Sequence, residues 1–332
     1  MDTNYQRATV TRVLQEETRG EGAMSEIHQE LEAKLSGDVV VQVTADIPYA
    51  RSEDGYDVGD QVIVTLQTYG DTTSYVVTDL LRLPDVGLVI FCFIAIACWF
   101  GRRHGAMALV GLAVSAAILV FGISPAILAG YNALLVSTLG GALILVASLL
   151  IAHGVNRRTL VALVSTLVTL GIAVVAAIAA VDLIGLSGAG TEEAIYLHVG
   201  AVAGLRLRDV LLGGMIIGAL GVLDDVTTAQ SAAVEEIAKA DASLSAGELY
   251  RRGLSIGREH IASLVNTLAL AYAGASFPLF ILLTMKDGPP WWVVLNSEAI
   301  TEEVVRALVG GAALILAVPI ATLIAPRVFA RR

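Results

Sequence analysis

The amino-acid sequence predicts a mainly α-helical membrane protein, a polytopic bundle of about seven transmembrane helices with a small N-terminal β-barrel-like domain. The chain has 332 residues, of which 56% are hydrophobic and only 16% charged, whereas soluble domains hold roughly 45–50% apolar and about 25% charged residues. Charge is also uneven, because residues 1–85 hold 16 acidic and 6 basic residues while residues 86–332 hold 15 of each. These observations divide the chain into an acidic domain at 1–84 and a transmembrane domain at 85–332.

The first domain carries the signals of short β-strands. Stretches rich in β-branched residues, separated by turn-forming residues, lie at 7–14, 38–44, 61–66 and 74–79. Residues 24–36 fit either another strand or a short helix. About four or five short strands in so small a segment favour an antiparallel barrel.

From Asp85 onward, apolar segments alternate with short charged connections, and most are near the roughly 20 residues that cross a bilayer. The expected spans are at about 86–101, 105–122, 126–152, 159–185, 208–232, 259–285 and 302–326. The glycine-rich connection at 186–205 contains Thr191, which is placed to cap a short helix with two glutamates in its first turn. That helix lies either on the surface or in a re-entrant segment.

The distribution of Lys and Arg predicts the orientation. Connections after the odd-numbered spans, with the C-terminus, hold eleven cations, whereas the other connections and their flanks hold four. The basic side should face the cytoplasm, so we expect a cytoplasmic C-terminus and an N-terminal domain outside the plasma membrane. Because Met1–Glu30 has no apolar signal segment, we expect a further span upstream. The alternative is that the domain stays inside and that the number of spans differs by one.

Several function classes lack support in the sequence. The acidic N-terminal domain disfavours nucleic acid as a partner, since phosphate binding needs a basic surface. No Walker A motif, dinucleotide fingerprint or nucleophile elbow occurs. The five histidines are spread singly, without the spacing of a metal site. We therefore expect no metal and no cofactor; the lipid bilayer is the expected partner, and a homo-oligomer is compatible with the sequence.

The fifth span is unusually polar for a membrane helix. Asp224 and Thr228 lie one turn apart on one face, with Asp225 beside them. Intramembrane carboxylates of this kind face a bundle interior or a water-filled cavity. Small residues nearer the start of the same span should let another helix approach closely; they are Gly214, Gly218 and Gly221.

The sixth span repeats this polarity. Glu259 and Asn266 share a face, and Arg258 precedes them. Spans five and six are antiparallel, so their inner halves can meet and Arg258 can partly neutralise the aspartates. The candidate coupling residues are Asp225, Asp224, Thr228, Arg258, Glu259 and Asn266.

Three roles compete for this set. The carboxylates could be purely structural, near the cytoplasmic interface and paired with Arg258. They could bind a proton or cation and couple it to transport of a small solute. They could also act in catalysis, but adjacent helical residues point roughly 100° apart. A catalytic dyad would then need Glu259 or Asp182 as its second carboxylate, so an enzyme is the least favoured and no catalytic residue is assigned.

Two stretches of these spans also resemble a known family. They are Gly218–Gln230, with an aspartate at Asp225, and Gly253–Gly274, with Arg258–Glu259 and the Asn-Thr-Leu of Asn266–Leu268. Both are similar to the signature of the YibE/F family of bacterial multi-pass membrane proteins, and the resemblance reaches back to Gly59–Val62.

The resemblance sharpens the hypothesis and shows where this chain departs from the pattern. Family members often have Met where Asp224 stands and usually Asp where Glu259 stands, and they begin with an additional span, so Asp225 becomes the preferred coupling residue. The resemblance implies transport as the usual hypothesis, here secondary transport or efflux of a small solute. The rival hypothesis is a non-transporting scaffold or sensor whose β-domain binds an envelope partner.

Overall fold

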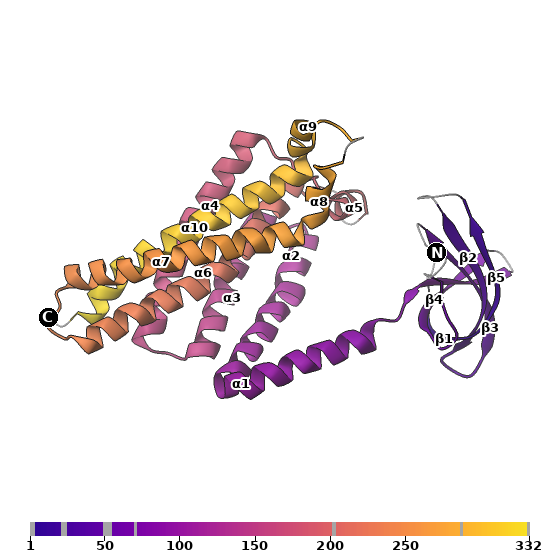
Figure 1. Cartoon of the computed structure of the whole chain (residues 1–332), viewed down its shortest axis with the longest axis horizontal. Coiled ribbons are helices and arrows are strands. Elements are labelled where there is room, and N and C mark those ends of the chain that lie inside the picture. Colours follow the sequence, from indigo (N-terminus) through magenta and orange to yellow (C-terminus); the bar gives the residue numbers. More distant parts are fainter. Residues whose placement is uncertain are drawn as a thin grey trace. The chain divides into compact units, whose positions relative to one another are not determined.

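The computed structural model describes residues 4–20, 25–48, 55–69, 72–200, 204–285 and 288–330 (Figure 1). The chain divides into two compact units, Met1–Ile96 and Ala97–Arg332, and each is described by itself.

The first unit contains the predicted small barrel. Its strands are β1 (Asn4–Arg19), β2 (Glu26–Leu35), β3 (Val40–Pro48), β4 (Gln61–Tyr69) and β5 (Thr72–Leu80). They form a closed barrel in the order β1-β2-β3-β5-β4. All pairs are antiparallel except β3 and β5, which meet in parallel at Thr44 and Val76. The segment that fitted either a strand or a helix is therefore a strand, β2.

Side-chain alternation builds the core of this barrel. Along β2, Ile27, Leu31 and Ala33 are completely buried while residues between them face outward. Gln29 is the polar exception on the buried face, and its amide donates to Glu16 Oε2 at 2.8 Å and accepts from the Tyr56 backbone at 2.8 Å. The barrel thus has a hydrophobic core of its own.

The rest of the chain is helical. The elements are α1 (Leu83–Ala117), the π-helix η2 (Ile118–Ile123), α2 (Ser124–Leu128), α3 (Ala133–His153), α4 (Arg157–Ile184), α5 (Glu192–Gly200), α6 (Leu207–Ala240), α7 (Ala246–Ala275), α8 (Phe277–Leu282), α9 (Trp291–Leu295) and α10 (Glu298–Phe329). Side-chain caps set several starts, as where Asn132 and Asn156 each accept a backbone N–H at 2.8 Å in the first turns of α3 and α4. The predicted cap at Thr191 is also present, because the Ala194 N–H donates to its hydroxyl at 3.2 Å.

Among the described residues, five helices are long and apolar enough to cross a membrane; they are Leu83–Leu128, Ala133–His153, Arg157–Ile184, Leu207–Ala240 and Glu298–Phe329. This count does not confirm the expected seven. The first two expected spans fall in one continuous segment of 46 residues, which is interrupted at Arg102, where φ is 47°. The expected span at 259–285 lies in α7 and α8, where polar residues lower the hydropathy.

Helix α6 is the centre of the bundle. It packs against α3, α4, α7 and α10 (Figure 1), and 56% of its most apolar stretch is buried, compared with 11% for the segment Leu83–Leu128. Leu220 and Leu223 of α6 share one core with Leu145 of α3 and Leu314 of α10. Polar side chains on the buried faces of this helix therefore have to be accommodated between helices.

Replacing Leu31 with Ala should destabilise the barrel by about 3 kcal/mol, because it leaves a cavity in a core that a small domain cannot refill. Hydrogen exchange of the β1 and β2 amides in the full chain measures the change. Val58, which is 63% exposed, provides the control, and Val58→Ala should change protection by less than about 0.5 kcal/mol. Equal protection in both variants would contradict the assigned core.

Candidate functional site

The C-terminal half of α6 presents polar side chains to two neighbouring helices. Asp224 lies against α3, where the Ser148 hydroxyl donates to its Oδ2 at 3.3 Å. The other oxygen of Asp224, Oδ1, is buried and has no hydrogen-bond partner among the described residues. A buried carboxylate oxygen without a donor is unfavourable unless a proton, a cation or water completes it.

Hydroxyl groups continue from Asp224 along the same side of α6. The Thr228 and Ser231 oxygens are buried and, within the part of the chain that the structure describes, unpartnered; so is the hydroxyl of Thr159 at the start of α4. Thr228 and Ser231 follow Asp224 by one and two helical turns toward the end of α6. The Oδ1 oxygen of Asp224 and the hydroxyls of Thr228 and Ser231 thus all lack partners among the described residues.

The adjoining hydroxyls of α4 are, by contrast, satisfied. Ser165, Thr166 and Thr169 each donate to the carbonyl one turn earlier in their own helix, at 2.6 to 2.9 Å. Thr166 also lies 2.6 Å from the hydroxyl of Thr227 on α6. This back-bonding satisfies hydroxyls within a helix, so none of these three hydroxyls is left without a partner.

Asp225 points elsewhere. Its side chain is exposed and forms no hydrogen bond or ion pair with any other residue in the described ranges. It lies close enough to His153, the last residue of α3, for its charge to act on that imidazole. The two adjacent aspartates therefore occupy different environments, one inside the bundle and one on its surface.

The structure does not bring the α7 candidates to the aspartates. Arg258, Glu259 and Asn266 are exposed, and the described residues include no hydrogen bond or ion pair between them and α6. The contact face of α7 is set instead by Gly253 and Gly257, and residues one or two positions beyond Gly257 point away from it. A coupling role for these three residues stays a prediction.

Gln230 joins three helices, and the candidate set did not include it. It is only 2% exposed, and its Nε2 donates at 2.8 Å both to the Gly253 carbonyl of α7 and to the Thr322 hydroxyl of α10. A Cβ at Gly257 would lie 2.9 Å from Gln230 Oε1 and 2.3 Å from Val318. The sequence signal for this junction was the pair of glycines four residues apart.

Two of the three predicted packing glycines do not lie where another helix comes close. Nothing lies within 4 Å of a Cβ built at Gly214 or Gly221, whereas one at Gly218 would lie 3.5 Å from the Tyr272 hydroxyl. At the neighbouring Gly213, a Cβ would lie 2.4 Å from Ser137 Oγ of α3. Gly213 is therefore the residue that permits α3 and α6 to pack closely.

At the other end of the bundle, carboxylates hold the connection after α4. Glu298 accepts from the backbone N–H of Ser187 and, at 2.9 Å, from that of Gly188, and the buried Glu302 accepts from the Gly190 N–H at 3.1 Å. A Cβ at Gly190 would lie 2.8 Å from the Glu302 carboxyl carbon. The glycines of this connection thus permit close backbone approach to α10.

Two further polar groups at this end were not predicted from the sequence. Asp209 accepts from Asn132 at 3.0 Å and pairs with Arg206 at 2.7 Å. Glu303 of α10 lies 3.4 Å from Arg306, whose Nε is buried and unpartnered among the described residues. In the sequence, Arg206 and Arg306 are two of the four cations in the connections and flanks on the less basic side.

Within the described residues, no group of three or more His, Cys, Asp or Glu side chains is arranged to hold a metal ion. The oxygens around Asp224 could instead serve a proton or a monovalent cation, since carboxylate and hydroxyl oxygens are hard ligands.

Comparison with known proteins identifies a family. The model of the family described as YibE/F-like protein matches residues 89–331. No curated protein and no solved structure matches the chain.

Substitution of Gly257 by Ala should weaken the packing of α7, because the new methyl group would meet Val318 and Gln230. We expect destabilisation by about 1–3 kcal/mol, the usual range for overpacking. The matched control is Gly247→Ala in the same helix, where nothing lies within 4 Å of a new Cβ and helix propensity should stabilise. Thermal unfolding of both variants in detergent checks this, and equal midpoints would contradict the assigned junction.

Proposed function

The chain belongs to the YibE/F-like protein family, and from this premise we propose that it is a secondary transporter of a small solute. In this proposal Asp224 binds the coupling proton or cation. The observation that carries it is the position of Asp224 inside the bundle, with one oxygen held by Ser148 and the other unpartnered among the described residues. An unpartnered intramembrane carboxylate is unfavourable, and reversible binding of a cation or proton at this oxygen gives it a function.

The hydroxyls that follow Asp224 along α6 support access of water to Asp224 from one side of the membrane. Thr228 and Ser231 lead from Asp224 toward the inner end of α6, and their oxygens lack partners in the described structure. Ordered water commonly satisfies such buried polar groups. We therefore propose a hydrated path between Asp224 and the cytoplasmic side, with Asp225 at its exposed edge beside His153.

Seven membrane crossings are part of the same proposal. A straight helix of 46 residues would be roughly 69 Å long, more than twice the about 30 Å of the hydrocarbon core. The break at Arg102 divides this segment into two stretches that each can span. For α7 and α8, support comes from the run Ile261–Met285, which contains no Asp, Glu, Lys or Arg. The barrel then lies outside the plasma membrane and the C-terminus in the cytoplasm.

The barrel gives the rival function its own support. It has a closed sheet and a separate hydrophobic core, so it could bind an envelope partner without any transport by the helices. In that case Asp224 would serve packing alone, and its conservative replacement would leave the biological phenotype unchanged in a folded protein.

Labelling with a hydrophobic carbodiimide, which reacts with protonated carboxyls in apolar surroundings, tests the role of Asp224. In proteoliposomes we expect labelling of wild type and of Asp225→Asn, and none of Asp224→Asn. Labelling should fall as the pH rises or as sodium ions occupy the site. Loss of labelling in Asp225→Asn with retention in Asp224→Asn would assign the labelled carboxyl to Asp225 and contradict the proposal.

Cysteine accessibility tests the crossings in a background where Cys92 and Cys98 are replaced by Ala. A membrane-impermeant maleimide should label Ser36→Cys, in the barrel, from outside intact cells. It should label Ser243→Cys, in the connection after α6, only after permeabilisation. If Leu83–Leu128 crossed only once, both positions would lie on the same side, and labelling of both from outside would refute seven crossings.

A further inference from the structure

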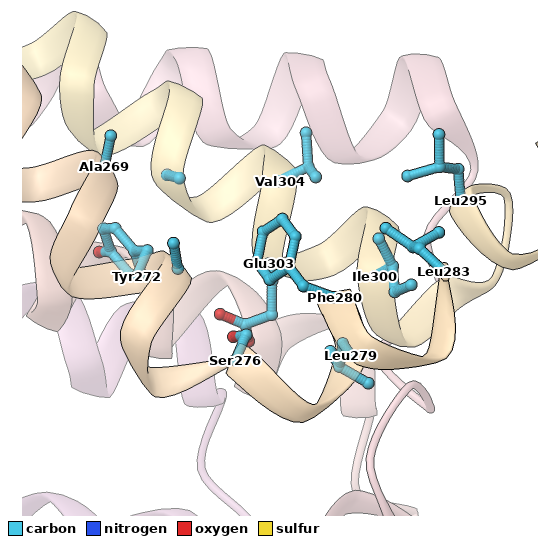
Figure 2. A pocket seen from close by; sticks show the side chains of 12 residues that line it. Ala269, Tyr272, Ser276, Leu279, Phe280, Leu283, Leu295, Ile300, Glu303 and Val304 are labelled. Atoms are coloured by element: carbon cyan, nitrogen blue, oxygen red, sulfur yellow. The ribbon is translucent and has the colours of Figure 1, made fainter. Parts of the chain in front are cut away.

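An apolar pocket separates the α7–α8 segment from α9 and the first turns of α10. Its volume is about 160 Å³, close to the roughly 150 Å³ of a protein cavity that binds benzene. Three of the residues that line it are polar, Tyr272, Ser276 and Glu303, and the other lining residues are apolar. Figure 2 shows the Glu303 carboxylate beside Ser276, with the Tyr272 ring at one end and Leu283 at the other. The space therefore suits one ring or a short aliphatic chain next to a carboxylate.

The carboxylate of Glu303 has unused capacity as an acceptor. It makes no hydrogen bond to a described residue, and the nearest cation, Arg306 Nη1, is 3.4 Å away. That separation is longer than the about 2.7–2.9 Å of a strong charged hydrogen bond. Arg306 does not line the pocket. An ionised carboxylate on an apolar wall favours a charged donor placed against it.

The residues that line the pocket disfavour a negatively charged ligand. Of the described residues that line the pocket, none is cationic, so an anionic group would be repelled by the Glu303 carboxylate and would meet no cation in the lining. An ammonium group would instead donate to Glu303 and be flanked by the Tyr272 and Ser276 hydroxyls. Phe280 and Val304 at the rim are partly exposed, which leaves the pocket open to a ligand arriving from its surroundings.

We propose that this pocket between α7–α8 and α10 binds an organic ammonium group attached to a small apolar body, with Glu303 as the counter-ion. The site is separate from Asp224, and its existence does not depend on whether the protein transports. Two sources carry an ammonium group, a free amphipathic amine and the phosphatidylethanolamine head group, whose phosphate would have to stay outside the pocket.

The test uses the full chain in phosphatidylcholine nanodiscs and three probes with matched bodies, 2-phenylethylammonium, 2-phenylethanol and 3-phenylpropionate. Binding measured by saturation-transfer NMR should be at least about tenfold tighter for the ammonium than for the alcohol, as expected for a hydrogen bond to a charged group. Binding of the propionate should be absent. Equal affinity for the three probes would overturn the proposal.

Variants assign the binding to this pocket. Glu303→Gln should reduce ammonium affinity at least about tenfold and leave the alcohol unchanged. Ala273→Phe should fill the cavity and abolish binding of both, whereas Ala271→Phe, at an exposed residue of the same helix that does not line the pocket, should preserve both. Retained ammonium binding in Ala273→Phe would place the site elsewhere and overturn the proposal, and Ala269→Leu is a second filling variant if Ala273→Phe does not fold.

Exchange of the lipid distinguishes the two sources. In phosphatidylethanolamine nanodiscs, a site that takes the lipid amine should bind 2-phenylethylammonium at least about tenfold more weakly, by competition. Unchanged affinity assigns the site to a free amine. Both results retain the ammonium chemistry, which the Glu303→Gln comparison decides.

Discussion

The polar side chains that α6 buries create a demand for hydrogen-bond partners inside the bundle, and the helix arrangement depends on where that demand is met. The amide nitrogen of Gln230 has partners on two helices, because it donates to the Gly253 carbonyl of α7 and to the Thr322 hydroxyl of α10. The Thr227 hydroxyl is hydrogen-bonded to the hydroxyl of Thr166 on α4. These contacts tie α6 to its neighbours at fixed registers, since an unmet hydrogen bond in a membrane interior costs several kcal/mol. The register in turn places Asp224 against Ser148.

The two ends of the bundle meet this demand differently. At one end, Glu298 and Glu302 accept hydrogen bonds from backbone N–H groups of the connection after α4. Asp209 accepts a hydrogen bond from Asn132 and forms an ion pair with Arg206. Around Asp224, by contrast, buried oxygens lack partners among the described residues. Buried oxygens without partners around Asp224 suit the proposed transporter, which would open its coupling site toward one side at a time.

Much of the fold followed from sequence patterns, whereas the side-chain arrangement depended on contacts that no pattern of one helix contains. Alternation predicted the barrel, although Gln29 on the buried face made residues 24–36 ambiguous. For α7, the stripe of Glu259 and Asn266 was interpreted as an inner face, but Gly253 and Gly257 set the contact face and the stripe lies outside. Asp224 and Asp225 were indistinguishable by depth and the resemblance favoured Asp225, whereas the structure places Asp224 against Ser148 of α3. Arg306 was counted only among the cations that flank spans, and its pairing with Glu303 was not predicted.

The central claim is that Asp224 takes up and releases a proton or cation within the folded bundle. Infrared difference spectra of the reconstituted protein, recorded across a pH step and a sodium step, report the carboxyl group directly. We expect a carboxyl band that changes in wild type and in Asp225→Asn and is lost in Asp224→Asn. A band that persists in folded Asp224→Asn, or no carboxyl change in wild type under either step, would contradict the claim.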